Sequence, residues 1–248
     1  MDNALMIGLS RQMTLRQSMD IVANNIANAN TAGFKVESLL LENAPAPTAE
    51  HQDGPSDINF VDIWGMGRDF RQGELEFTGR TFDLAIEGEG FFGVESANGE
   101  EYTRDGRFHI DDLGQLVARD GAPILDADTR GPIILNPAAE EVRIVDGGRI
   151  IEDGVEVGRI GVFLIENRGD LSKEGNGRYT LPEMAPEDLP LAAFEASVQQ
   201  GYVEASNVQT VVQLTDMMAI TRAYESVSKF LSDTHDLNRK ALERLGKA

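Results

Sequence analysis

The sequence predicts an α+β fold, in which long N- and C-terminal helices can form a coiled coil and a mostly β, barrel- or sandwich-like region lies between them. Apolar residues recur every three or four positions near both ends, which is the period of a helix. Turn dipeptides separate short apolar runs in the middle, which is typical of an all-β domain. Charge divides along the same lines, because residues 36–203 carry a net charge of −21, whereas residues 1–35 carry +1 and residues 204–248 carry none.

These patterns divide the 248-residue chain into four parts. Residues 1–35 are predicted to be an N-terminal helical segment, and residues 36–70 a linker or extended arm. Residues 71–203 are predicted to form a β-rich domain, and residues 204–248 a C-terminal helix. Because the two ends are nearly neutral and the middle is strongly acidic, we expect the ends to pack among other chains while the middle faces water.

The N-terminal helix is predicted from an apolar stripe with alternating spacings of four and three residues. The stripe consists of Leu15, Met19, Val22, Ile26 and Ala29. This 3.5-residue period is typical of a coiled-coil seam. The helix should end near Gly33, because glycine readily adopts the left-handed conformation found just past a helix C-terminus.

The C-terminal helix is predicted to span about residues 206–245, with Ser206 or Asn207 as its N-cap. Its apolar stripes consist of Leu214, Met217, Thr221, Tyr224, Ser228 and Leu231, and of Val227, Phe230, Thr234, Leu237 and Ala241. A helix of this length needs another helix beside it, and the N-terminal helix is the obvious partner. An amphipathic pair on a globular body would explain the pattern. A coiled coil that assembles with copies of itself and its relatives is the more specific interpretation.

Dipeptides of Asp-Gly or Asn-Gly, which favour the positive φ angles of tight hairpins, recur through the middle of the chain. They lie at 53–54, 98–99, 105–106, 120–121, 146–147, 153–154 and 176–177. Between them, short apolar or alternating runs predict strands at 83–86, 91–94, 115–118, 133–135, 142–145 and 160–165. Residues 42–58, which are rich in proline, glycine and acidic residues, are predicted to be flexible or extended.

The composition argues against several classes of protein. With 22 Lys and Arg against 42 Asp and Glu, the net charge is −20, so the chain lacks the basic surface that nucleic acids and anionic membranes require. It has no cysteine, which removes disulfides, thiolate metal sites and cysteine nucleophiles. No apolar run approaches the ~18 residues of a membrane span. Charged residues at 11, 16 and 20 would interrupt the apolar core of a cleavable leader. We therefore expect neither nucleic-acid binding nor membrane insertion, and any export to proceed without such a leader.

Two motifs resemble cofactor or metal sites without fitting them. Residues 88–93 match the glycine spacing of a dinucleotide-binding loop, but a polar, turn-rich stretch follows instead of a helix that could hold a pyrophosphate. These glycines are better explained by a tight β turn that packs Phe91 and Phe92. Residues from Asp126 begin like a calcium loop, but Arg130 occupies a ligand position and Pro137 stands where the closing glutamate should be.

The chain also offers no convincing catalytic arrangement. The three histidines, His51, His109 and His235, are isolated and lack metal-ligand spacing. The Asp111-Asp112 pair is better explained as a solvated face than as a carboxylate dyad. The sequence therefore predicts no catalytic, cofactor-binding or metal-binding residues, no cofactor, and a protein that is not an enzyme.

Several motifs resemble those of bacterial flagellar rod and hook proteins. The terminal motifs are the run from Ala23 to Lys35 (ANNIANANTAGFK) and, near the other end, Ser206-Asn207-Val208 and Arg222-Ala-Tyr-Glu225. The middle motifs lie at 72–79, 83–92 and 102–106, and the first 13 residues resemble one rod protein of the family in particular. The resemblance covers the whole chain.

The resemblance implies a structural subunit of the basal-body rod, the shaft that transmits torque across the periplasm. It implies a helical inner domain built from both termini, an outer β domain, and self-association into a tubular helical assembly. The implied partners are further copies of this chain, other proximal rod proteins, the distal rod protein and the flagellar type III export apparatus. Two alternatives stay open: the distal rod protein of the same family, and a soluble β-sandwich binding module with a dimerising coiled coil.

The asparagine-rich motif also has a physical interpretation. Asn24 and Asn28 are one helical turn apart and share a face, and buried amides are costly unless they are paired. Paired amides fix the register and the partner of a helix. We therefore predict an assembly interface on the two terminal helices. Its residues are Leu15, Met19, Val22, Asn24, Asn25, Ile26, Asn28, Asn207, Val208, Leu214, Met217, Arg222, Tyr224 and Leu231.

Overall fold

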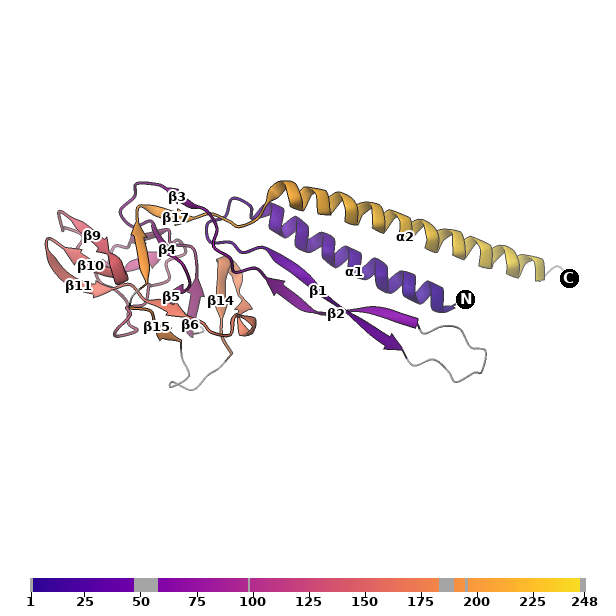
Figure 1. Ribbon diagram of the computed structural model, residues 1–248, viewed down its shortest axis with the longest axis horizontal. Helices are drawn as coiled ribbons and strands as arrows, with labels where there is room; N and C mark the ends of the chain where they lie inside the picture. The colour runs from indigo at the N-terminus through magenta and orange to yellow at the C-terminus, as the bar shows by residue number, and fades with distance from the viewer. Residues whose placement is uncertain (1, 47–57, 98, 183–189, 195, 246–248) are drawn as a thin grey trace. The chain divides into compact units, whose positions relative to one another are not determined.

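The computed structural model describes residues 2–46, 58–97, 99–182, 190–194 and 196–245, and it divides into two units (Figure 1). The helical unit comprises Met1–Ala29, Val36–Asp69 and Val208–Ala248. The β unit comprises Asn30–Lys35 and Phe70–Asn207. The predicted α+β class is confirmed, because the described residues form two α-helices and several β-sheets.

The two helices of the helical unit, α1 (Asp2–Ala27) and α2 (Thr210–Leu245), run antiparallel in contact with each other. At one end, the side-chain amide of Asn25 donates to Gln213. At the other end, a Cβ added to Gly8 would lie 2.6 Å from Leu231 Cδ2, so glycine allows a close approach. The α2 residues that are half-buried at alternating spacings of four and three are Gln213, Met217, Ile220, Tyr224, Val227, Leu231 and Thr234.

The ends of both helices differ from the prediction. Helix α1 ends at Ala27, before the predicted end near Gly33, although Gly33 does have the left-handed φ of 69°. Helix α2 begins at Thr210, so the predicted cap at Ser206 or Asn207 is wrong. The reason is that the Asn207 side chain donates to the Arg71 carbonyl within the β unit instead.

A long antiparallel hairpin completes the helical unit. Strands β1 (Glu37–Ala46) and β2 (Ile58–Arg68) pair along their length, with a bulge between Leu40 and Leu41, and both contact α1. These strands occupy most of residues 36–70, the segment predicted as a linker or extended arm. The central part of the predicted flexible stretch, residues 47–57, lies outside the described residues.

The β unit is built from small open sheets. A six-stranded sheet has the order β13-β14-β6-β5-β12-β15, a three-stranded sheet has the order β11-β10-β9, and three two-stranded sheets are β16-β4, β17-β3 and β7-β8. The strands are β3 (Leu75–Phe77), β4 (Leu84–Glu87), β5 (Phe91–Ser96), β6 (Gly99–Thr103), β7 (Phe108–Ile110), β8 (Leu116–Ala118), β9 (Val142–Val145), β10 (Arg149–Glu152), β11 (Val155–Arg159), β12 (Val162–Leu164), β13 (Ser172–Lys173), β14 (Arg178–Thr180), β15 (Leu191–Ala192), β16 (Ser197–Gln200) and β17 (Tyr202–Glu204). Single-turn 3₁₀ helices are η1 (Asp146–Gly148), η2 (Arg168–Asp170) and η3 (Gly175–Gly177).

The predicted barrel is therefore wrong in one respect: the described sheets do not close. The six-stranded sheet ends on two-residue strands at both edges, β13 and β15, and such short strands offer few backbone groups for further pairing. The predicted strand at 133–135 is also absent, because Ile134 forms an isolated bridge and Ile133 and Leu135 belong to no strand. The other predicted strands overlap β4, β5, β8, β9 and β12.

The turn chemistry expected from the sequence is confirmed at two hairpins. Between β10 and β11, Asp153 and Gly154 have φ values of 48° and 88°. Between β13 and β14, Asn176 and Gly177 have φ values of 62° and 72°. Consecutive positive φ angles match the right-handed twist of the flanking strands.

Two apolar clusters hold the β unit together. The larger consists of Leu84, Ile86, Phe92, Val94, Phe108, Leu116, Ile124, Ile133, Leu135, Ile144, Ile150, Ile160, Val162 and Val198. The smaller consists of Phe91, Tyr102, Leu125, Phe163, Ile165, Leu171 and Tyr179. Gly90, in the glycine-spaced motif, has a φ of 127°, and a Cβ there would lie 2.7 Å from Val162 Cγ1. Strand β5 follows directly, so these glycines form the turn that buries Phe91 and Phe92, as predicted.

The calcium-like motif folds into an internally satisfied turn. Asp126 Oδ1 accepts hydrogen bonds from the backbone amides of Asp128 and Thr129 and from the Thr129 hydroxyl, and its Oδ2 accepts from the Arg159 amide. Burial alone would raise the pKa of the Asp126 carboxyl, but these donors outweigh burial and lower it below its ordinary value.

We expect Asp126→Asn to lower the free energy of unfolding by about 2 kcal/mol at pH 7, because the hydrogen bonds lose their charged acceptor. A carboxyl whose pKa is depressed by folding stabilises the protein above its unfolded-state pKa and loses that contribution as the pH falls through the folded-state pKa. The difference in the free energy of unfolding between wild type and Asp126→Asn should therefore decrease as the pH is lowered. Urea unfolding at pH 7 and at about pH 3 measures both values, and an equal difference at the two pH values would contradict this role.

Candidate assembly site

Asn25 is the most completely buried polar side chain among the described residues of the helical unit. It is 1% exposed, and both polar atoms of its side chain form hydrogen bonds to other elements. Its Nδ2 donates to the Glu37 carbonyl at 2.8 Å and to Gln213 Oε1 at 2.9 Å, and its Oδ1 accepts from the Glu37 amide at 3.0 Å. One side chain of α1 therefore joins the start of β1 and the start of α2. Glu37 in turn forms an ion pair at 3.1 Å with Arg68, opposite it on β2.

Asn24 and Asn28, the other two α1-region asparagines of the predicted assembly interface, have different surroundings. Asn24 is exposed. Asn28 lies just beyond the end of α1 and donates its side-chain amide back to the Asn24 carbonyl at 2.9 Å. The Asn25 amide, in contrast, pairs with both β1 and α2.

The remaining predicted interface residues fall into three groups. Val22 and Val208 are buried, each 9% exposed. A half-buried group consists of Leu15, Met19, Ile26, Asn207, Met217, Tyr224 and Leu231. Leu214 and Arg222 are exposed.

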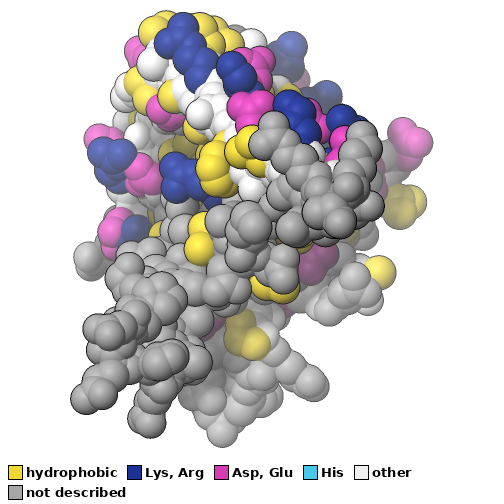
Figure 2. All heavy atoms as spheres, turned by 90° about the vertical axis from the view of Figure 1, so that its right-hand side faces the viewer, with side chains coloured by type: hydrophobic (Ala, Val, Ile, Leu, Met, Phe, Trp, Pro, Cys, Tyr) yellow, Lys and Arg dark blue, Asp and Glu magenta, His cyan; other side chains and the backbone are white. Residues whose placement is uncertain are grey.

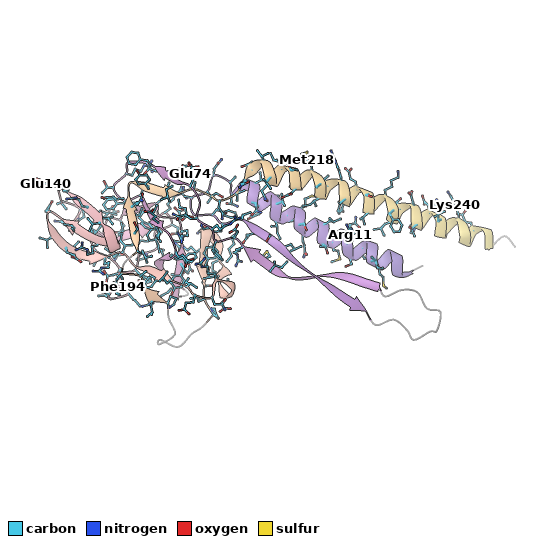
Figure 3. The ribbon with its side chains drawn as sticks, viewed as in Figure 1. Arg11, Glu74, Glu140, Phe194, Met218 and Lys240 are labelled. Atoms are coloured by element: carbon cyan, nitrogen blue, oxygen red, sulfur yellow. The ribbon has the colours of Figure 1, made fainter. Side chains whose placement is uncertain are left out.

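Both helices also carry apolar side chains on their outer surfaces. On α1 these are Met6, Leu9 and Met13, which are between 51% and 62% exposed and recur at helical spacing. On α2 they are Val211, Val212, Leu214, Met218, Phe230 and Leu237, which are between 47% and 77% exposed. Figure 3 shows Met218 pointing away from α1, and Figure 2 shows hydrophobic side chains beside charged ones on the visible surface. A helix that is apolar on more than one face needs more than one partner.

The β unit holds a buried ion cluster where the segments that lead to α1 and α2 enter it. Glu204 Oε1 accepts from Lys35 Nζ at 2.5 Å and from the Gly73 amide at 2.9 Å. Glu204 Oε2 accepts from Arg104 Nη1 at 3.0 Å. The Lys35 ammonium also donates to the Arg71 carbonyl at 2.8 Å. We call Lys35, Arg104 and Glu204, which are at most 4% exposed, the junction cluster.

Backbone contacts hold the two segments of the junction together. The Gly33 amide donates to the Glu204 carbonyl at 2.7 Å, and the Asn207 amide donates to the Phe34 carbonyl at 3.3 Å. A Cβ on Gly33 would lie 2.4 Å from the Arg104 carbonyl carbon, so only glycine allows this approach. Residues 30–35 and 204–207 are therefore fastened side by side in the β unit.

Arg104 is a strongly desolvated cation of the junction cluster. Burial lowers the pKa of its guanidinium from the ordinary value, and the Glu204 carboxylate counteracts this in part. Its Nη2 donates to the Gly88 carbonyl at 2.7 Å, and its guanidinium carbon lies 5.3 Å from the centre of the Phe91 ring. Breaking a buried ion pair on one side leaves an uncompensated charge, so each member depends on the others.

Sequence reasoning did not identify the junction cluster. Its members are separated by 69 and 100 positions, and none has the spacing of a catalytic or metal motif. One pattern could have identified two of its members, namely a single charged residue between two apolar residues. This pattern occurs at Phe34-Lys35-Val36 and at Val203-Glu204-Ala205. Charged side chains are rarely fully buried unless paired, so such a pattern indicates a buried partner.

Neither unit presents a metal centre or a membrane helix within the part of the chain that the structure describes. No group of three or more His, Asp or Glu side chains there could hold a metal ion. Neither described helix is long and apolar enough to cross a membrane.

Three family models match the chain, and all three describe flagellar axial proteins. Residues 5–35 match a model described as flagella basal body rod protein. Residues 85–151 match the flagellar hook protein FlgE/F/G D1 domain, and residues 199–244 match the flagellar basal body rod FlgEFG protein C-terminal region. The matches therefore include α1 with the segment after it, a large part of the β unit, and most of α2.

Relatives match over the full length. The flagellar basal-body rod protein FlgF of Caulobacter vibrioides is 47% identical over 247 residues, covering 100% of this chain and 99% of that protein. FlgF of Rhizobium meliloti is 33% identical, covering 99% of both chains. FlgG of Bacillus subtilis, another flagellar basal-body rod protein, is 28% identical, covering 94% of this chain and 96% of that protein. This chain belongs to the flagellar basal-body rod protein family.

Proposed function

We propose that this chain is a structural subunit of the flagellar basal-body rod and that it acts by assembling, with no catalytic step. The observation that carries the proposal is the similarity to a rod protein FlgF along the entire chain. The exposed apolar faces of both helices support it, because a monomer in water gains nothing from Met6, Leu9 and Met13 on the outside of α1. The rod lies in the basal body, within the periplasm.

The finer architecture follows from the same features. We infer that α1 and α2 form the inner, coiled-coil part of the assembly, together with copies of this chain and its relatives. Helix α2 has an a/d-like series of half-buried residues toward α1, and its outer apolar residues are free to meet a second helix. The acidic β unit forms the outer part, where its charge keeps it solvated.

The partners are those of a rod subunit. They are further copies of this chain, proximal rod proteins on one side, the distal rod protein on the other, and the flagellar type III export apparatus that delivers the subunit. The FlgF relatives match more of this chain than the FlgG relative does, which favours the FlgF-like position in the rod over the distal one.

We predict that deleting residues 2–29 or residues 208–245 reduces the amount of this chain in purified basal bodies at least ten-fold. Either deletion removes one helix of the assembling pair but keeps Lys35 and Glu204, so the junction cluster and both apolar clusters of the β unit stay complete. Quantitative immunoblotting of basal bodies from cells that express a tagged chain measures incorporation. Thermal unfolding of the purified variants should still show one cooperative transition.

Three outcomes would contradict this assignment in different ways. A full-length tagged chain that is missing from basal bodies would refute the function itself. A deletion variant present at the wild-type amount would show that the helices do not drive assembly. A variant without a cooperative transition would show that the β unit does not fold on its own.

A further inference from the structure

A positively lined hollow stands out on the surface of the strongly acidic β unit. Residues 70–207 hold 12 Lys and Arg against 28 Asp and Glu, a net charge of −16. Nevertheless, a hollow of about 700 Å³ is lined by Arg80, Arg107 and Arg119, with His109 beside them. The acidic side chain in its lining is that of Asp83, which is only 3% exposed.

Two of the three arginines that line this hollow, Arg80 and Arg119, differ from the ion-paired arginines of the β unit. Of the 11 arginines in residues 70–207, at least eight form ion pairs with described carboxylates of the same chain, including Arg107, which Asp105 binds through two contacts of 2.8 and 2.6 Å. Arg80 and Arg119 are exposed, and neither has an ion pair with any described carboxylate. In a unit with more than twice as many acidic as basic residues, two neighbouring arginines without an ion pair to a described carboxylate are poorly explained by the monomer.

We propose that this hollow, which we call the arginine hollow, receives a carboxylate-bearing segment from the β unit of a second copy of this chain. Arginine presents a planar set of donors that matches a carboxylate in two-point contacts, and arginine is enriched at protein interfaces. A second copy supplies the required charge, because its β unit carries 28 acidic residues. The proposal rests on the proposed function, which brings copies of the chain side by side.

The sign of the charge also sets the symmetry of the contact. A positive hollow cannot pair with itself, so the two copies must use different surfaces. Such heterologous contacts generate rings or open helical assemblies instead of closed dimers. This geometry suits a subunit of a shaft, and each contact would offset part of the repulsion between neighbouring acidic β units.

The test replaces Arg80 and Arg119 by lysine and uses a zero-length carbodiimide, which couples an amine to a carboxylate in direct contact. Cells express full-length chain with Arg80→Lys and Arg119→Lys, or the control pair Arg143→Lys and Arg149→Lys. The control positions are exposed arginines elsewhere in the β unit, 64% and 45% exposed. Basal bodies are purified and treated, cross-linked dimers are separated by size, and mass spectrometry identifies the joined peptides.

We expect at least ten-fold more dimer from the Arg80→Lys, Arg119→Lys chain than from the control, with the new lysines joined to Asp or Glu of a second copy. No dimer from variant chain that is present in basal bodies, or lysine adducts to a different protein only, would overturn the proposal. Absence of even the wild-type chain from basal bodies would instead refute the proposed function. If only the Arg80→Lys, Arg119→Lys chain is missing from basal bodies, and its melting temperature equals that of the wild type, the result would support a contact that requires the geometry of arginine.

Discussion

Glu204→Gln is expected to lower the free energy of unfolding of the β unit by about 3–5 kcal/mol, because it leaves the buried cations of Lys35 and Arg104 without their anion. Lys35 approaches one carboxylate oxygen at 2.5 Å and Arg104 approaches the other at 3.0 Å, so neither cation keeps a charged partner after the substitution. The NH₂ group of the glutamine would also face one of these two cations, which are themselves hydrogen-bond donors. For a unit of this size, the melting temperature should fall by about 10–16 °C. Thermal unfolding followed by circular dichroism measures the change.

Glu76→Gln is the matched control for this prediction. Glu76 lies on β3, opposite Val203 of β17, and its side chain is exposed. It should change the free energy of unfolding by no more than about 0.5 kcal/mol. Lys35→Met combined with Arg104→Met and Glu204→Leu should recover part of the stability lost in Glu204→Gln, because it removes all three buried charges together. Equal melting temperatures for Glu204→Gln and Glu76→Gln would show that the junction cluster contributes little.

Features that depend on neighbouring residues could be predicted from the sequence. The 3.5-residue apolar period places both helices to within a few residues, and Asp153-Gly154 specifies its hairpin turn by local backbone preference alone. The predicted positions of the helix ends were less accurate. Helix α2 starts four residues late because the Asn207 amide and side chain bond to residues of the β unit, and such tertiary contacts override capping preference.

Features that depend on distant pairing could not be predicted. Residues 36–70 were interpreted as a linker or extended arm because Pro45 and the polar residues after it suggest a stretch without regular structure. The pairing of β1 with β2 and the contact of both strands with α1 could not be read from that segment alone. The open sheets were missed for the same reason, since strand order is not encoded in any one window. Of the candidate site, the helical location could be inferred. The contact of Asn25 with Gln213 joins residues 188 positions apart, and Glu204 of the junction cluster meets residues 100 and 169 positions away.

Asn25→Leu is expected to weaken the helical unit and reduce incorporation into basal bodies at least ten-fold. Leucine is a better helix former than asparagine, so helix propensity alone predicts a gain. However, the change removes all three hydrogen bonds of the amide and leaves the Glu37 amide and carbonyl in a site where the Asn25 side chain was 1% exposed. Each buried group that loses its partner costs about 1–3 kcal/mol. Hydrogen exchange of β1 and α1 in the purified chain should therefore accelerate.

Asn24→Leu separates this effect from helix propensity, because it makes the same chemical change one position away, on an exposed side chain. It should leave hydrogen exchange in β1 unchanged and basal-body incorporation at the wild-type amount. The pair of variants distinguishes two roles for the asparagine motif. Reduced incorporation of Asn25→Leu together with accelerated hydrogen exchange means that the subunit must hold α1, β1 and α2 in register before it can add to the rod. Accelerated exchange with normal incorporation would mean that neighbouring subunits restore this register during assembly, and unchanged exchange would mean that the three hydrogen bonds do not hold these elements together.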